Sequence, residues 1–121
     1  MSDEFRNYRD LLVWQKGMDL AGAAYKMTAC FPNEELFGLT SQVRRAAASV
    51  PANVAEGWGR DMPGVYVQHL RVAQGSLKEL ETHVILACRV SLIEESQAAP
   101  VLSLADEIGR MLRRMIRSIE R

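Results

Sequence analysis

The sequence has no excess of charge of either sign and few turn-forming residues. Fifteen Lys and Arg balance fifteen Asp and Glu in 121 residues, so the whole-chain charge favours neither nucleic acid nor a basic protein as a partner. Eight glycines and four prolines are too few for an all-β chain built from tight turns. The two cysteines, Cys30 and Cys88, exclude a disulfide scaffold.

Membrane and secretion signals are also missing. The apolar runs are far shorter than the roughly 20 residues of a membrane span, and the first residues show no apolar stretch after a basic start. Hydrophobic residues make up 48% and charged residues 25% of the chain, which are globular values. We therefore expect a single cytoplasmic domain, over residues 1–121, that makes no membrane contact.

Four segments carry apolar residues at alternating spacings of three and four, the pattern of amphipathic helices. They are Leu11, Trp14, Met18, Ala21, Tyr25 and Thr28; Leu36, Leu39, Val43, Ala46 and Val50; Leu70, Ala73, Leu77, Leu80, Val84 and Ala87; and Val101, Ala105, Ile108, Leu112, Met115 and Ile119. Short connections between such segments predict an all-α fold, an antiparallel up-down four-helix bundle.

Prolines and glycines mark the expected helix ends. Pro51 interrupts the second segment, so we predict a kinked helix there, closed by Gly57 and Gly59. Pro63 and Pro100 stand where the first turns of the third and fourth helices tolerate proline.

The first helix carries a second apolar stripe. At 100° per residue this stripe lies about 130° from the first one, and it consists of Val13, Leu20, Ala24, Met27 and Phe31. A wide core face with scattered exposed apolar residues would explain it. Contiguous exposed apolar residues also mark interfaces between subunits, and we favour an oligomer interface at these five residues.

No pattern of residues predicts catalysis or metal binding. His69 and His83 are about 21 Å apart along one helix, and neither follows a Glu at the spacing of a di-iron site. The cysteines lack zinc or redox spacing, and no phosphate loop or nucleophile elbow occurs. We expect no metal, no cofactor, no small-molecule substrate and no enzymatic activity.

Polar residues of the second and third helices are expected to form a structural network. Asn53 falls on the core stripe of the second helix, and Glu56 lies one turn along. Because buried polar groups need hydrogen bonds, we expect both to meet backbone groups beside Pro51 or polar partners on the third helix, with Glu81 and Thr82 as candidates.

The last helix ends in five arginines on the side opposite its apolar stripe: Arg110, Arg113, Arg114, Arg117 and Arg121. Cations near a helix C-terminus suit the helix dipole, and charge runs are commonly solvated faces. All five are Arg and none is Lys, which suits recognition of phosphate or carboxylate. Both interpretations remain open from the residues alone.

Five stretches resemble the four-helix-bundle family encoded in intervening sequences of bacterial 23S ribosomal RNA genes. They are residues 11–16 (LLVWQK), 31–32 (FP), 37–47 (FGLTSQVRRAA), 49–57 (SVPANVAEG) and 75–82 (GSLKELET). The string Ser-x-Pro-x-Asn-x-Ala-Glu-Gly within residues 49–57 is the most specific of them. The resemblance implies a bundle that assembles as a homopentamer.

Relatives of similar fold act as accessory factors to reverse transcriptases, and this implies RNA, DNA or a reverse transcriptase as partners. The residues that would bind nucleic acid are Arg44, Arg45 and the five arginines of the last helix. We therefore expect a non-enzymatic homopentameric scaffold associated with nucleic acid. The alternative is a protein–protein adaptor with no nucleic-acid role.

Overall fold

The computed structural model describes residues 7–121, and this part of the chain is helical with no strand. The elements are η2 (Tyr8–Asp10), α1 (Leu12–Thr28), η3 (Asn33–Glu35), α2 (Leu39–Arg60), α3 (Pro63–Arg89) and α4 (Glu95–Glu120). The prediction of an all-α fold with four main helices is confirmed.

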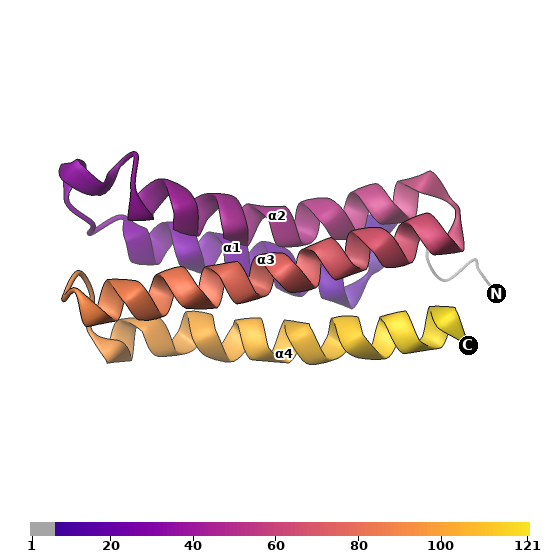
Figure 1. The fold of residues 1–121 in the computed structure, drawn as a ribbon. Helices are drawn as coiled ribbons and strands as arrows, with labels where there is room; N and C mark the ends of the chain where they lie inside the picture. Colours follow the sequence, from indigo (N-terminus) through magenta and orange to yellow (C-terminus); the bar gives the residue numbers. More distant parts are fainter. Residues whose placement is uncertain (1–6) are drawn as a thin grey trace.

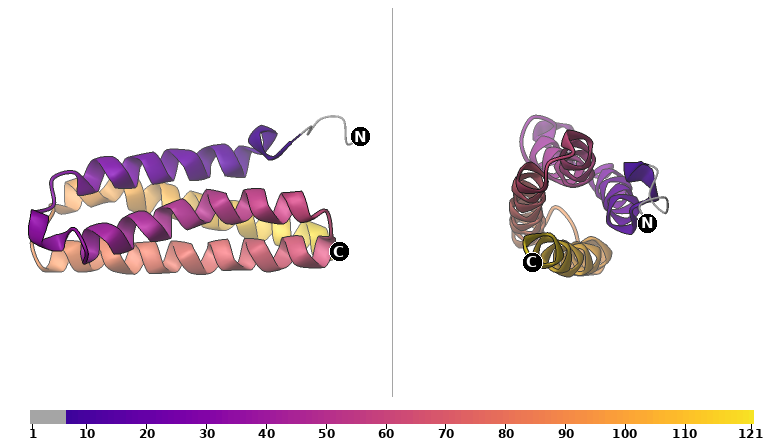
Figure 2. Two further views of the ribbon diagram at one scale, coloured as in Figure 1. Left: turned by 90° about the horizontal axis from the view of Figure 1, so that it is seen from above. Right: turned by 90° about the vertical axis from the view of Figure 1, so that its right-hand side faces the viewer.

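Successive helices run in opposite directions along one bundle, and the C-terminus lies at the same end as the turn between α2 and α3 (Figure 1). A view along the bundle shows the four helices around a common centre, with α1 beside α4 (Figure 2). The pair α2 and α3 shares the most extensive contact, and the pair α1 and α4 the least among neighbours.

The core faces of α3 and α4 largely follow the sequence pattern. All six predicted positions of α3, from Leu70 to Ala87, are buried. On α4 four of the six are buried, while Met115 and Ile119 are partly buried and Ile116 takes a core position. On the second segment Val43, Ala46 and Val50 are buried, but Leu36 is exposed because it precedes α2. Periodicity therefore predicts the core well wherever a helix has a single apolar stripe.

The prediction for α1 is wrong in part: Leu11 and Thr28 of the predicted core stripe are buried, but the second stripe also faces the core. The five residues expected at an oligomer interface face the core of the single chain, none of them more than 8% exposed: Val13, Leu20, Ala24, Met27 and Phe31. Met18 and Tyr25, expected in the core, are 48% and 49% exposed. Side chains that are already enclosed by their own chain cannot provide a subunit interface.

The ends of two helices also differ from expectation. α2 stays helical through Pro51, Gly57 and Gly59 and ends only at Arg60, where Asp61 adopts a left-handed conformation with φ 59°. A left-handed residue is a common helix stop, and Asp tolerates it better than most side chains. α4 begins at Glu95, so Pro100 lies beyond its first turn.

The glycine at position 57 sets the separation of α2 and α3. A Cβ atom there would lie 2.8 Å from the Cβ of His69 and 2.9 Å from the Cδ1 of Tyr66, closer than carbon atoms pack. Gly57 therefore permits a close approach of α2 to α3, one turn before α2 ends.

We predict that Gly57→Ala destabilises the protein by about 1–3 kcal/mol, because the new methyl group must push the two helices apart. Gly75→Ala is the matched control, since nothing lies within 4 Å of its Cβ position on α3, and alanine there should stabilise the helix by up to about 1 kcal/mol. Urea denaturation measures both. Equal stability of the two variants would show that α2 and α3 are not in tight contact at Gly57.

Candidate functional site

A chain of hydrogen bonds joins α2 to α3 one turn above Gly57. Nδ1 of His69 lies 3.0 Å from Oδ1 of Asn53, and because a carbonyl oxygen only accepts, the histidine donates. Asn53 Nδ2 donates to the backbone oxygen of Ser49 at 2.9 Å and to its Oγ at 3.0 Å. The Ser49 hydroxyl is 2.8 Å from that of Ser76. We call these four residues the polar seam.

The polar seam corrects the predicted network. Asn53 does meet both a backbone group and a polar residue of α3, but its partner is His69. Glu56 is exposed and pairs with Arg60 at 3.3 Å, and Glu81 pairs with Lys78 at 3.1 Å. These carboxylates lie outside the seam, because Glu56 is exposed on α2 and Glu81 lies just over three turns beyond His69 on α3.

Arg44 is held by the C-terminal end of α1. Its Nε donates to Thr28 Oγ1 at 2.8 Å, one Nη donates to the Tyr25 carbonyl at 3.5 Å, and the guanidinium lies 4.5 Å from the centre of the Tyr25 ring. Cations stabilise the carbonyl end of a helix. Arg44 therefore has a structural role, which leaves it poorly placed for nucleic acid. Arg45, its neighbour, is exposed.

The outer face of α4 carries more guanidinium groups than its carboxylates neutralise. Asp106 pairs with Arg110, while the other two acids of this half of α4 reach neighbouring helices: Glu107 binds Lys16 at 3.0 Å and Glu120 binds Arg71 at 2.8 Å. Four exposed arginines have no acidic partner among residues 7–121, and we call them the arginine stripe: Arg113, Arg114, Arg117 and Arg121.

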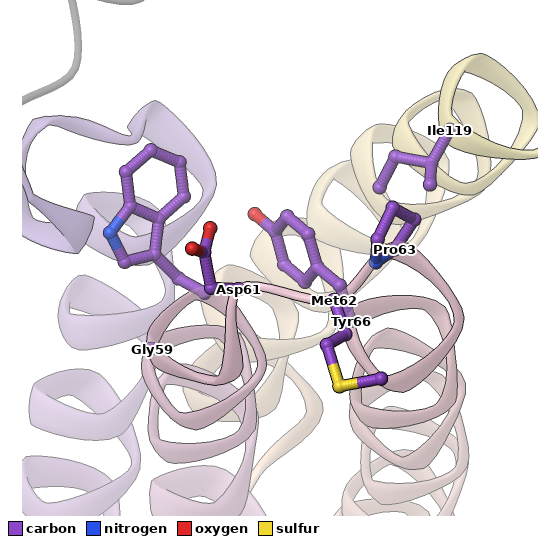
Figure 3. Close-up of a pocket in the computed structure, with 7 residues that line it drawn as sticks. Gly59, Asp61, Met62, Pro63, Tyr66 and Ile119 are labelled. Atoms are coloured by element: carbon purple, nitrogen blue, oxygen red, sulfur yellow. The ribbon is translucent and has the colours of Figure 1, made fainter.

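A cleft of about 600 Å³ opens at the end of the bundle where α2 turns into α3. It is lined by Trp58, Gly59, Asp61, Met62, Pro63, Tyr66 and Ile119 (Figure 3). The Trp58 and Tyr66 rings meet edge to face, 6.3 Å apart at 84°. Figure 3 shows Asp61 at the turn between the two helices, with Tyr66 on the first turn of α3. Of the seven described residues that line the cleft, Asp61 alone is charged.

The hydroxyl of Tyr66 is buried and has no hydrogen-bond partner within the described chain. Burial raises the pKa of this hydroxyl above its ordinary value of about 10, because desolvation disfavours the phenolate. The group is therefore a neutral hydroxyl at physiological pH, able to donate or accept one further hydrogen bond.

No helix among residues 7–121 is both long and apolar enough to cross a membrane. Within the same range, no group of three His, Cys, Asp or Glu side chains is arranged to hold a metal ion.

Sequence reasoning predicted neither the cleft nor three of the four residues of the polar seam. Trp58 lies between two glycines that looked like a helix stop, and the turn after Arg60 carried no motif. Nothing within the third helix connects His69 to Asn53, which lies at the same height along the bundle on the antiparallel helix α2. Both features follow from the register of the second helix against the third, which neither helix shows on its own.

The fold, the polar seam and the basic outer face of α4 define a small four-helix-bundle protein. Residues 9–114 match the family of 23S rRNA-intervening sequence proteins, and the chain belongs to this family. No curated protein matches the sequence significantly.

The structure is similar to a crystal structure at 1.70 Å of a protein of unknown function from the S23 ribosomal protein family of Bacteroides thetaiotaomicron. The two share 22% sequence identity over 87% of this chain and 98% of the other, with a TM-score of 0.78. At this identity the likeness establishes the fold.

We predict that Tyr66 makes the protein less stable in alkali. Above about pH 10 the unfolded chain loses the Tyr66 proton while the folded protein retains it, so the free energy of unfolding falls as the pH rises. Tyr66→Phe should lose less stability than wild type between about pH 8 and pH 11. Chemical denaturation of both proteins at each pH measures the difference, since the two proteins are otherwise identical. Identical pH profiles would contradict the burial of the Tyr66 hydroxyl.

Proposed function

We propose that this protein is a non-enzymatic, homo-oligomeric scaffold of the cytoplasm that associates with nucleic acid through the arginine stripe of α4. The observation that carries the proposal is that four neighbouring guanidinium groups are exposed and lack an acidic partner in the described chain. A guanidinium binds phosphate with paired hydrogen bonds, which suits this use better than lysine would.

The zero net charge is compatible with this function because the charge is unevenly distributed. Residues 106–121 hold five arginines and three carboxylates, which leaves ten basic and twelve acidic residues elsewhere in the chain. The stripe extends over about 12 Å from Arg113 to Arg121. A local basic patch of this kind attracts phosphates without a whole-chain excess, although its range is limited to about one Debye length.

The assembly part of the proposal rests on an exposed apolar strip along α1 and α2. Met18 and Tyr25 are half exposed, Trp14 and Ala21 are partly buried beside them, and Ala48 of α2 is exposed. Ala48 lies between Arg44 and Pro51 on α2. Because these two residues contact Tyr25 and Gly17 of α1, Ala48 lies beside the middle of α1. We call these five residues the α1–α2 strip. Contiguous exposed apolar residues favour a subunit interface.

Five copies is the number that the family resemblance implies. In a closed ring the arginine stripe repeats in every subunit, so weak phosphate contacts act together when one nucleic-acid strand spans several subunits. The exposed apolar residues equally suit a protein–protein adaptor, which is the second candidate function.

We predict that replacing the four residues of the arginine stripe by Gln leaves the fold intact, because surface changes usually alter stability by less than about 0.5 kcal/mol each. Binding of a labelled RNA and of duplex DNA at low salt should weaken. The slope of log affinity against log salt should shrink by about 0.7–0.9 for each lost phosphate contact. Fluorescence anisotropy over a salt series measures both quantities.

The matched control removes four cations elsewhere: Arg9, Lys26, Lys78 and Arg89. Since the loss of net charge is the same, the control should bind more tightly than the stripe variant. Equal weakening in both would show that net charge rather than the stripe is responsible. Absence of binding by the wild-type oligomer would exclude the nucleic-acid function and favour the adaptor.

We predict that Met18→Glu dissociates the oligomer, because a carboxylate buried between apolar surfaces has no partner. Ile85→Glu is the matched control on α3, since Ile85 is 45% exposed against 48% for Met18. Light scattering with size-exclusion chromatography should show smaller particles for Met18→Glu alone. The opposite result would place the interface on α3, and a monomeric wild type at micromolar concentration would refute the oligomer.

A further inference from the structure

We propose that the cleft between the α2–α3 turn and the end of α4 binds an organic cation, an ammonium or guanidinium group on an alkyl chain. The proposal concerns a different surface from the arginine stripe and is independent of nucleic-acid binding. It rests on three features of the cleft, namely its charge, its aromatic lining and a polar atom without a partner.

The charge of the cleft has one sign. Asp61 is exposed, and its carboxylate makes no ion pair or side-chain hydrogen bond with the described residues. The nearest arginine in sequence, Arg60, is already bound to Glu56 at 3.3 Å. A carboxylate without a partner attracts a cation and repels a phosphate or carboxylate ligand.

The walls of the cleft suit the rest of such a ligand. Trp58 and Tyr66 stand nearly perpendicular to each other, and the faces of aromatic rings attract ammonium and guanidinium groups, Trp most strongly. Met62, Pro63 and Ile119 provide apolar surface for an alkyl chain. The volume of about 600 Å³ falls within the usual range for small-ligand sites.

The Tyr66 hydroxyl gives the cleft a polar atom in need of a partner. Its oxygen is buried without a hydrogen bond to any described residue, an arrangement that weakens the free protein. Because the oxygen is not accessible in the free protein, a ligand N–H reaches it only when the side chains that cover it shift, and the new hydrogen bond then removes the cost. Phenylalanine would fill the same space without that cost, so packing alone does not account for a tyrosine here.

A structural role explains Asp61 in part. Its left-handed conformation ends α2, and its carboxylate lies two residues before Pro63, where a negative charge suits the N-terminus of α3. Asn also tolerates the left-handed conformation. Asp61→Asn therefore removes the charge while keeping the turn, which makes it the appropriate test variant.

The cation has two possible sources, a free polyamine or a basic side chain of a partner protein. Spermidine represents the first source, and the blocked peptide acetyl-Gly-Arg-Gly-amide the second. The same peptide with citrulline in place of arginine is the neutral control, because citrulline keeps the shape and loses the charge. Each probe is titrated into the wild-type protein, whose two tryptophans give two indole N–H signals in NMR spectra.

The expected result is a saturable shift of the Trp58 indole signal, while that of Trp14 stays unchanged. A shift caused by spermidine alone would identify a free polyamine as the ligand. A shift caused by the arginine peptide alone would identify a basic side chain of a partner protein. Citrulline peptide should cause no shift. Asp61→Asn should weaken binding about tenfold and Tyr66→Phe about fivefold, with the latter at least as thermally stable as wild type.

Asp19→Asn is the matched control, because Asp19 is exposed on α1 and distant in sequence from the cleft. It should bind the probe like wild type. Equal weakening by Asp19→Asn and Asp61→Asn would overturn the proposal, since it would show diffuse attraction to acidic residues. A Trp58 signal that does not respond to either cation, or responds equally to citrulline peptide, would overturn it too.

Discussion

The close approach of α2 to α3 is the constraint on which the rest of the structure depends. Gly57 removes the side chain that would hold the two helices apart, and the polar seam then fixes their register through His69, Asn53 and Ser76. Hydrogen bonds have directional geometry, so a shift of either helix by one residue would break the seam. The position of the α2–α3 turn, and with it the cleft, follows from this register.

Sequence periodicity predicted where the helices lie in the sequence better than it predicted which face of each helix points to the core. On α3 a single apolar stripe left one possible core face, and all six positions are buried. On α1 two stripes of similar quality were present. The choice between them depended on contacts with α2, where Gly17 meets Pro51 and Arg44 binds Thr28. Such contacts join residues far apart in the sequence and leave no trace in the periodicity of one helix.

The candidate sites also differ in how much of each one can be predicted from the sequence. The arginine stripe could be recognised because it repeats along one helix, and the structure adds only which guanidinium groups lack partners. The cleft combines α2, α3 and α4, so no local motif describes it. The polar seam is intermediate. The need of Asn53 for a partner could be inferred from its place on an apolar face, whereas the identity of His69 required the register of the two helices.

The arginine stripe and the cleft place opposite chemistry at one end of the bundle. The carboxylates of α4 that would neutralise the stripe instead tie α4 to α1 and α3, through Glu107 and Glu120. Asp61, by contrast, has no partner in the described chain and lines the same cleft as Trp58 and Tyr66. Surface ion pairs contribute little to stability, so pairing these groups within the chain would gain the fold little. Leaving them unpaired keeps the charge of both surfaces available to partners of opposite sign, which bind more readily to groups that need not first be released from an internal ion pair.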